Sequence, residues 1–313
     1  MELRKIATRE SYRNALAALG TEHSNLVVLD ADLAGATKTS TFQKVYPDRH
    51  YDCGIAEADM MCVAAGLSTT GLVPFASSFA MFAAGRACEQ SRNSIGYPRL
   101  NVKIGATHGG ISVGEDGASH QCCEDFALMR SIPGMVVICP ADDVEARAAV
   151  NAAYEYEGPV YLRFGRLAVP VFHDEDNFQF RIGRGEVLRE GTDVAIIANG
   201  LMVYEAIKAG EALAQEGIQA MVINMATVKP LDEELILTAA KKCSRVITCE
   251  EHSVIGGLGE AVSALIAKKC PTYVECIGVN DEFGHSGSAE ELLKQFGLTA
   301  ECIVKTAREI CSA

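Results

Sequence analysis

The chain has 313 residues, of which 49% are hydrophobic and 22% are charged, and its net charge at pH 7 is −13. This length and composition are typical of a globular protein with two domains, and no run approaches the roughly 18–20 apolar residues of a membrane-spanning helix. The acidic balance argues against nucleic-acid binding, which needs a basic surface, but it allows an anionic substrate that is bound by a few clustered cations.

The first part of the chain alternates helical patterns with apolar runs that are typical of buried strands. It opens on an amphipathic segment without an apolar signal core, so we expect no export and a cytoplasmic location. Helices are predicted over residues 8–19, 55–70, 82–94 and 143–156. Strands are predicted over residues 25–30, 73–76, 101–107, 135–139 and 160–164.

Residues 170–186 are the best candidate for a domain boundary. They include a proline, a polar run from His173 to Asn177 and two glycines, and they lack a helical or strand period. A second series follows, with strands predicted over 193–198, 220–224, 245–249 and 273–279 and helices over 203–216, 231–242 and 259–269. We therefore predict an α/β protein with two doubly wound domains, each a parallel sheet flanked by helices.

The 12 cysteines form no Cys-x-x-Cys pair, and their spacing does not match a zinc site. We expect them to be free thiols in a reducing compartment. We therefore expect no metal ligands in this chain.

Three local features of the first domain are candidates for chemistry. Glu57, in Gly54-Ile55-Ala56-Glu57, joins a strand end to a helix start, where open α/β sheets bind ligands, although position alone favours a carboxylate that complements the helix dipole. Phe79 and Phe82 are three residues apart, and spacing alone favours core packing for them. The third feature is the loop 106–121, with four glycines, two histidines and two acids, which we interpret as functional rather than structural.

The order and spacing of these features resemble the transketolase family, and the similarity extends over almost the whole chain. The long loop is the most specific part. The matching motifs are Gly54-Ile55-Ala56-Glu57, Ser78-Phe79-x-x-Phe82, Thr107-His108-x-x-Ile111-x-x-Gly114-Glu115-Asp116-Gly117-x-x-His120-Gln121, Val228-Lys229-Pro230-Leu231-Asp232 and Glu250-Glu251-His252-Ser253-x-x-Gly256-Gly257-Leu258-Gly259.

The resemblance implies that residues 1–178 are a pyrimidine-binding domain for thiamine diphosphate and that residues 185–313 are a transketolase C-terminal domain. In the family, an earlier domain with a Gly-Asp-Gly motif holds the diphosphate and magnesium, and this chain has no such motif. The resemblance therefore implies an N-terminal partner subunit, a homodimer contact through this chain, and a heterotetramer. The implied reaction moves a two-carbon glycolaldehyde unit from a ketose phosphate to an aldose phosphate, as in the pentose phosphate pathway.

The resemblance also assigns roles to single residues. Glu57 matches the carboxylic acid that binds the pyrimidine N1′ and promotes loss of a proton from the cofactor, and His120 matches a histidine that moves protons on sugar hydroxyls. The residues that correspond to further cofactor contacts are Leu33, Phe79 and Phe82. Those that correspond to substrate contacts are Arg9, His108, Asp116 and Arg166, with the arginines gripping phosphate.

The sequence departs from single-chain transketolases at two positions near the predicted site. Ala36 stands where those enzymes have a phosphate-contacting serine, which leaves Thr37 or Thr39 as substitutes, and Gly85 stands where they have a tyrosine. The sequence therefore does not identify the sugar substrate.

Three other functions compete with this hypothesis. A 1-deoxyxylulose-5-phosphate synthase shares the Ile-Ala-Glu motif and a similar loop, but its single-chain forms carry all domains together. The β subunit of a 2-oxo acid dehydrogenase has a comparable length, but the Gly-Glu-Asp-Gly-x-x-His-Gln loop favours sugar chemistry. A non-catalytic regulatory subunit is disfavoured because Glu57, Phe82 and His120 are all present.

Overall fold

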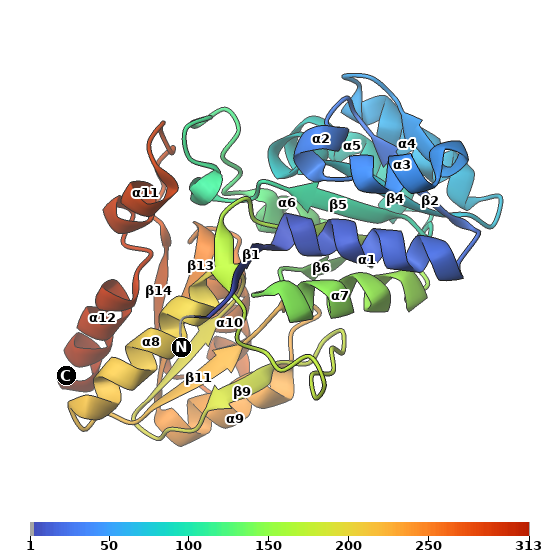
Figure 1. Cartoon of the computed structure of the whole chain (residues 1–313). Coiled ribbons are helices and arrows are strands. Elements are labelled where there is room, and N and C mark those ends of the chain that lie inside the picture. The colour runs from blue at the N-terminus through green and yellow to red at the C-terminus, as the bar shows by residue number, and fades with distance from the viewer. Residues whose placement is uncertain (1–2, 313) are drawn as a thin grey trace.

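Two sheets of mostly parallel strands organise the chain, one in each of two domains that lie side by side (Figure 1). The computed structural model describes residues 3–312. No helix within this range is long and apolar enough to cross a membrane. The predicted α/β class with two domains is confirmed.

The first sheet has seven strands in the order β12-β6-β7-β5-β4-β2-β3. Its central strands consist of buried residues on both faces, as expected for parallel strands covered on both sides. The strands are β2 (Leu26–Asp30), β3 (His50–Asp52), β4 (Val73–Phe79), β5 (Lys103–Thr107), β6 (Val136–Ile138), β7 (Val160–Arg163) and β12 (Thr227–Lys229). All pairs are parallel except β12 with β6.

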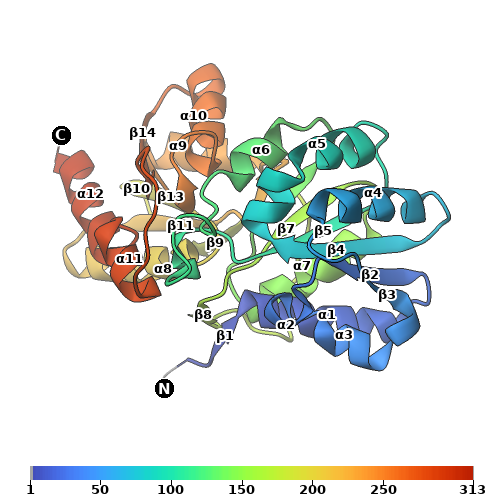
Figure 2. The same ribbon diagram turned by 90° about the horizontal axis from the view of Figure 1, so that it is seen from above.

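Helices cover both faces of this sheet (Figure 2). One face carries α1 (Thr8–Glu22), α3 (Ser40–Val45) and α7 (Asp143–Glu155). The other carries α4 (Glu57–Ser68), η2 (Met81–Arg86), α5 (Cys88–Gln90), η3 (Ser91–Gly96) and α6 (Asp125–Ser131). The shorter pieces are α2 (Ala34–Thr37), η1 (Pro47–Arg49) and η4 (Ile111–Val113).

The second sheet has five strands in the order β14-β13-β10-β11-β9, and only β9 is antiparallel to its neighbour. The strands are β9 (Glu186–Arg189), β10 (Val194–Ala198), β11 (Ala220–Asn224), β13 (Arg245–Ser253) and β14 (Tyr273–Val279). Helices α8 (Met202–Gln215), α11 (Ala289–Gln295) and α12 (Ala300–Ser312) pack on one face. Helices α9 (Glu233–Cys243) and α10 (Leu258–Lys269) pack on the other.

The two domains are tied together by more than one chain crossing. Residues 171–185 contain no helix or strand, which agrees with the predicted boundary region. After this link, β12 returns to the first sheet, where Thr227 pairs with Ile138. The short strands β1 (Lys5–Ala7) and β8 (Ala168–Pro170) form an antiparallel pair. One apolar cluster also contains residues of both domains, so the interface is part of the core.

Most predicted helices and strands are present, but the helix predicted over residues 82–94 differs in kind. Residues 81–96 form two wide, π-helical turns, η2 and η3, with the short α5 between them. A π-helix has a wider turn than an α-helix and is frequently found at functional sites. Residues four apart lie near one face here, as they do in an α-helix, and Phe82 and Arg86 come together.

Candidate active site

The predicted site residues gather at one edge of the first sheet. Leu33 follows β2, Glu57 follows β3, Phe79 ends β4, His108 follows β5 and Arg166 follows β7. Because these strands are parallel, their carboxyl ends meet at the same edge, which is where open α/β sheets bind ligands.

Glu57 is a buried acid at the first residue of α4. Gly54, at φ +69°, makes the turn out of β3 that leads to it. The Glu57 side chain is only 2% exposed, and both of its carboxylate oxygens accept a hydrogen bond from Nη1 of Arg86, at 3.2 and 3.1 Å. Among residues 3–312, a buried carboxylate therefore lies at the sheet edge with one arginine as its ion-pair partner.

Four aromatic rings form a cluster beside this acid. Phe79 stacks on Phe82, with ring centroids 5.9 Å apart, and on His108, at 3.8 Å. His120 meets both phenylalanines edge-on, at 6.1 and 5.3 Å. The predicted cofactor-contacting phenylalanines and both predicted histidines thus lie in one place.

His108 is held as a neutral ring by its neighbours. Arg9 has only donor groups, so its Nη1 donates to Nε2 of His108 at 2.9 Å, and the proton on Nδ1 then faces the Thr107 hydroxyl at 2.8 Å. Burial is the largest cause that lowers the pKa of His108, followed by the charges of Arg9, Arg166, His120 and Lys38, and together they bring it from 6.5 to about 3. These basic groups therefore surround one buried ring, which makes a local positive field in an acidic protein.

Arg9 and Arg166 are close enough to affect each other. Burial lowers the pKa of Arg9, and the charge of Arg166 adds to this effect. Arg9 donates to the Ala36 carbonyl at 3.2 Å, and its Nε is buried without a hydrogen-bond partner. The side chain of Arg166 is 36% exposed and lies 3.4 Å from Glu115 and 3.7 Å from Asp116. Its charge is thus shared with the two acids of the loop.

The substitutes considered for the missing family serine are not available. Thr37 and Thr39 are both buried, and each hydroxyl donates to Oδ2 of Asp30, at 2.8 and 2.6 Å. The other oxygen of Asp30 accepts the backbone N–H of Leu33 at 2.7 Å. Asp30 therefore orders the turn after β2, and the half-buried Leu33 lies in that turn.

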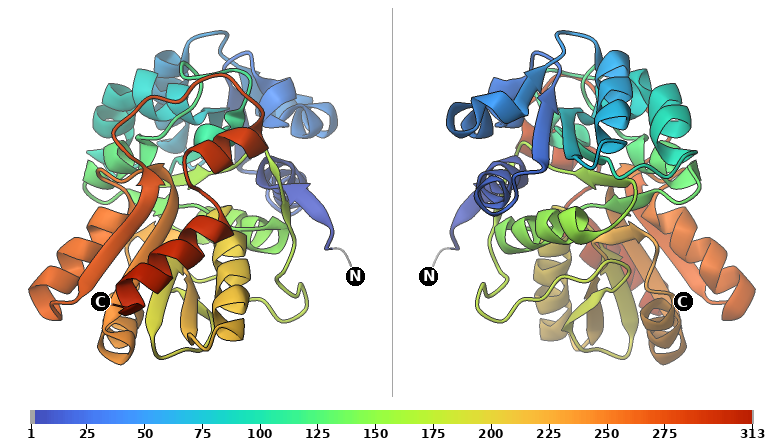
Figure 3. Two further views of the ribbon diagram at one scale, coloured as in Figure 1. Left: turned by 90° about the vertical axis from the view of Figure 1, so that its left-hand side faces the viewer. Right: turned by 90° about the vertical axis from the view of Figure 1, so that its right-hand side faces the viewer.

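The second domain holds the histidine loop in place. The carboxylate of Glu251, on β13, accepts the backbone N–H of Ser112 at 2.6 Å, and burial raises the pKa of this acid. Gln121 donates to the carbonyls of Ile111, at 3.1 Å, and His285, at 3.0 Å. Figure 3 (left) shows the segment between β14 and α11, which contains His285, arching over towards the first domain.

Sequence reasoning missed two residues of this site. Arg86 is one turn after Phe82, and a helical spacing argument applied to the pair would have found it. Glu251 belongs to a motif that was recognised, but its contact with the loop joins residues 139 positions apart. No local pattern reveals such a contact.

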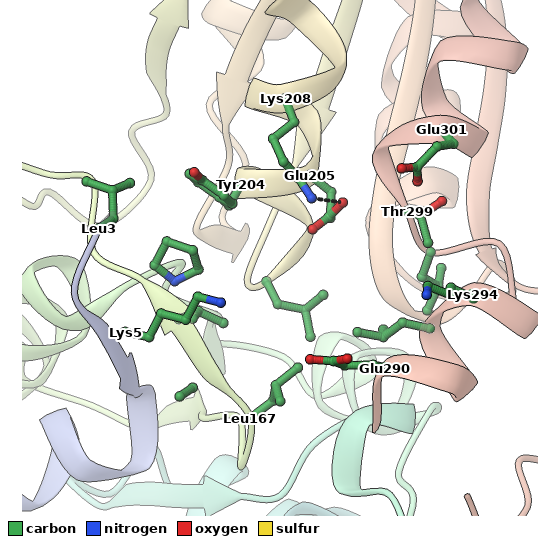
Figure 4. A pocket seen from close by; sticks show the side chains of 16 residues that line it. Leu3, Lys5, Leu167, Tyr204, Glu205, Lys208, Glu290, Lys294, Thr299 and Glu301 are labelled. Atoms are coloured by element: carbon green, nitrogen blue, oxygen red, sulfur yellow. Dashed lines mark ion pairs between the residues drawn. The ribbon is translucent and has the colours of Figure 1, made fainter. Parts of the chain in front are cut away.

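A cavity of about 460 Å³ lies away from this site, between the β1–β8 pair and α8, α11 and α12 (Figure 4). None of the predicted site residues lines it. Its lysines and glutamates are equally numerous, and Lys208 pairs with Glu205 at 2.7 Å. The cavity therefore shows no preference for an anion or a cation.

Two family models match successive parts of the chain. The transketolase pyrimidine binding domain matches residues 4–171, and the transketolase C-terminal domain matches residues 183–303. The fold is thus that of a chain with a transketolase pyrimidine-binding domain followed by a transketolase C-terminal domain. The chain belongs to the transketolase family, and it corresponds to the C-terminal section of these enzymes.

Similar proteins include both separate subunits and longer chains. A protein of Methanocaldococcus jannaschii, described as a transketolase C-terminal section, is 51% identical and aligns over 96% of this chain and 95% of its own length. A 6-deoxy-6-sulfo-D-fructose transketolase subunit of Clostridium sp. is 43% identical over 96% of this chain and 94% of its own length. Human transketolase is 37% identical, and the aligned region is 49% of its length.

A solved structure supports the same grouping. It is described as a split gene transketolase in an inactive β4 tetramer, and it is 50% identical to this chain. The TM-score is 0.90, and the match covers 99% of both chains. The chain is therefore a subunit of the split transketolase type.

Proposed function

We propose that this chain is the pyrimidine-binding subunit of a two-chain transketolase that transfers a two-carbon unit from a ketose phosphate to an aldose phosphate. The observation that carries this proposal is the position of Glu57 and Phe82 beside Arg9, His108, His120 and Arg166. A cofactor-activating acid, an aromatic stacking surface and an anion site then meet at one sheet edge.

The acid and the aromatic ring fit the aminopyrimidine end of thiamine diphosphate. Glu57 is buried and pairs with Arg86, whose guanidinium also lies over the Phe82 ring, so a flat heterocycle stacked on Phe82 would have an acid within reach. Bound thiamine diphosphate supplies a carbon nucleophile for the ketose carbonyl. The role of Glu57 is to hold and share a proton at the pyrimidine N1′.

The substrate groups follow from the positive field around His108. Arg9 and His108 form the buried end of this field, and Arg166 forms its exposed end, which suits the phosphate of a sugar. His120 lies edge-on to both phenylalanines, where it can exchange protons with sugar hydroxyls near the cofactor. Asp116 would recognise a hydroxyl once Arg166 turns to the phosphate.

A similar protein adds a second candidate for the sugar substrate. The Clostridium subunit acts, by its name, on a sulfonated fructose, so an anionic ketose with a sulfonate is a second candidate substrate. The same arginines suit both anions. We place a ketose phosphate first because the two guanidinium groups of Arg9 and Arg166 match the roughly double negative charge of a phosphate better than the single charge of a sulfonate.

The diphosphate and magnesium would be held by a separate chain. The sequence has no Gly-Asp-Gly motif, and human transketolase is about twice the length of the aligned region. We propose a partner subunit with that motif, two interfacial sites in a heterotetramer, and a contact between two copies of this chain. The division into domains at residues 1–178 and 185–313 is part of the same proposal.

Reconstitution tests this function. The purified chain is mixed with a Gly-Asp-Gly subunit, thiamine diphosphate and Mg²⁺, and product is measured from xylulose 5-phosphate with ribose 5-phosphate as acceptor. We expect release of glyceraldehyde 3-phosphate. Parallel assays use 6-deoxy-6-sulfo-D-fructose, and pyruvate with glyceraldehyde 3-phosphate. Carbon dioxide from pyruvate, without turnover of any ketose, would contradict the proposal and favour a synthase of the deoxyxylulose type.

A further inference from the structure

Arg86 is the residue that touches both halves of the proposed pyrimidine site. Its Nη1 lies 3.2 and 3.1 Å from the two oxygens of Glu57, and its Cζ lies 4.3 Å from the ring centroid of Phe82. The Glu57 side chain is 2% exposed and that of Arg86 is 52% exposed. The arginine therefore covers the buried acid from the solvent side.

Arg86 makes the same kinds of contact with Glu57 and Phe82 that the proposed pyrimidine would make. A guanidinium is flat, carries N–H donors and stacks on aromatic rings, and a pyrimidine with a proton on N1′ shares these three properties. Because one guanidinium reaches both Glu57 and the face of Phe82, it fills the corner between them. A pyrimidine that stacks on Phe82 and binds Glu57 needs the same corner.

Burial gives a physical reason for this arrangement. A carboxylate removed from water is costly unless a charged or hydrogen-bonding partner accompanies it. In the part of the chain that the structure describes, Arg86 is the ion-pair partner of Glu57. The long side chain is half exposed and can swing into solvent when another partner arrives, whereas Glu57 is fixed at the start of α4.

We propose that Arg86 occupies the place of the pyrimidine in the cofactor-free chain and leaves it when thiamine diphosphate binds. Arg86 is then a competitor of the cofactor, built into the chain, which keeps Glu57 paired until the complete site assembles. This proposal rests on the proposed function of Glu57 and Phe82.

The test compares Arg86→Ala with the parent in the complex reconstituted with a Gly-Asp-Gly subunit. Binding of thiamine diphosphate with Mg²⁺ is measured by isothermal titration calorimetry, and its association rate by stopped flow. Loss of a half-exposed ion pair and a cation–π contact predicts about three- to thirtyfold tighter binding, which is about 0.7–2 kcal/mol at 1.4 kcal/mol per tenfold. Association should be faster. Arg86→Lys, which keeps the charge but not the flat fork, should fall between the two.

Arg92→Ala is the matched control. Arg92 lies in η3 of the same helical segment, is exposed and contacts its neighbour Asn93, so its loss should leave cofactor affinity unchanged. A crystal structure of the parent complex with cofactor should show Arg86 away from Glu57. Unchanged or weaker binding in Arg86→Ala would overturn the proposal, as would an intact Arg86–Glu57 pair beside a bound pyrimidine.

The two proposals fail in different ways. If the parent complex turns over a ketose with thiamine diphosphate but Arg86→Ala does not bind the cofactor more tightly, only the role of Arg86 is wrong. If the parent complex binds no thiamine diphosphate, the proposed function is wrong and the role of Arg86 with it.

Discussion

Among single residues, Glu57 makes the sharpest prediction. Glu57→Gln keeps the size of a side chain that is 2% exposed but removes the acid, so the fold should persist while turnover of the reconstituted enzyme falls about a hundredfold or more. Turnover is measured with thiamine diphosphate saturating. Asp59→Asn changes an exposed acid in the same helical turn and serves as the control. Near-parental turnover in Glu57→Gln would show that catalysis does not need the carboxylic acid of Glu57.

Arg9 tests the anion site. A charge-assisted hydrogen bond contributes about 1.5–3 kcal/mol, so Arg9→Ala should cost roughly ten- to a hundredfold in kcat/KM for phosphorylated sugars and spare glycolaldehyde as acceptor. Arg166→Ala should act in the same direction but less, because Arg166 is already paired with Glu115 and Asp116.

The measurement is the ratio of the rates with phosphorylated and unphosphorylated substrates. Arg13→Ala, on the outer face of the same helix, should leave this ratio at the parental value. An unchanged ratio in both Arg9→Ala and Arg166→Ala would mean that the phosphate binds elsewhere.

His108 makes stability depend on pH. The folded chain keeps this ring neutral because burial and the neighbouring charges lower its pKa from 6.5 to about 3. Between these two pH values the unfolded chain binds more protons, so the free energy of unfolding falls as the pH falls, by up to about 1.4 kcal/mol per pH unit for this group.

His108→Gln should weaken this dependence. Denaturant unfolding of both chains is measured at pH 7.5, 6.5 and 5.0, and the value at pH 7.5 separates any general loss of stability. We expect a shallower decline towards pH 5.0 in the variant. Parallel declines in the two chains would show that the ring is already protonated in the folded parent.

Among the structural elements, the histidine loop depends on a strand of the other domain. Glu251→Ala leaves the backbone N–H of Ser112 buried without its acceptor, which should cost about 1–3 kcal/mol of unfolding free energy. Turnover should fall as well, because the loop carries His108 and His120. Glu260→Ala, at an exposed position on α10, is the control for stability in the same domain. If Glu251→Ala lowers the free energy of unfolding by less than about 0.5 kcal/mol, the histidine loop keeps its conformation without this contact.

The π-helical turns over residues 81–96 were not predictable from the sequence pattern. Periodicity predicted a helix over residues 82–94, and a helical segment is present over 81–96. The pattern of apolar residues does not distinguish an α-turn from a π-turn, since both bury one face. The pairing of Phe82 with Arg86 does not depend on this difference, because residues four apart share a face in both kinds of helix.

For the whole molecule, the prediction concerns assembly. The isolated chain should bind thiamine diphosphate weakly, if at all, and should not turn over, because the groups for the diphosphate and magnesium are proposed to lie on another polypeptide. Adding a Gly-Asp-Gly subunit should produce a complex with two copies of each chain, measured by analytical ultracentrifugation together with activity. Full activity of the purified chain alone would contradict this arrangement.

The sequence by itself determined the parts of this protein that depend on local pattern. Alternation of apolar runs and helical periods predicted the two α/β domains, and residues 171–185 are the irregular link that composition indicated. The order of the motifs also identified the family. Glu57 and the loop with His108 were expected after strand ends, and parallel pairing brings such ends together at one edge.

Only the tertiary structure decided which of these groups touch each other. β12 returns from the second domain to the first sheet, Glu251 reaches the histidine loop, and Arg86 closes over Glu57. These contacts join residues between 29 and 139 positions apart, and burial, not spacing along the chain, selects them. A buried charge or backbone group must find a partner somewhere in the fold, and only the folded packing shows which partner is within reach.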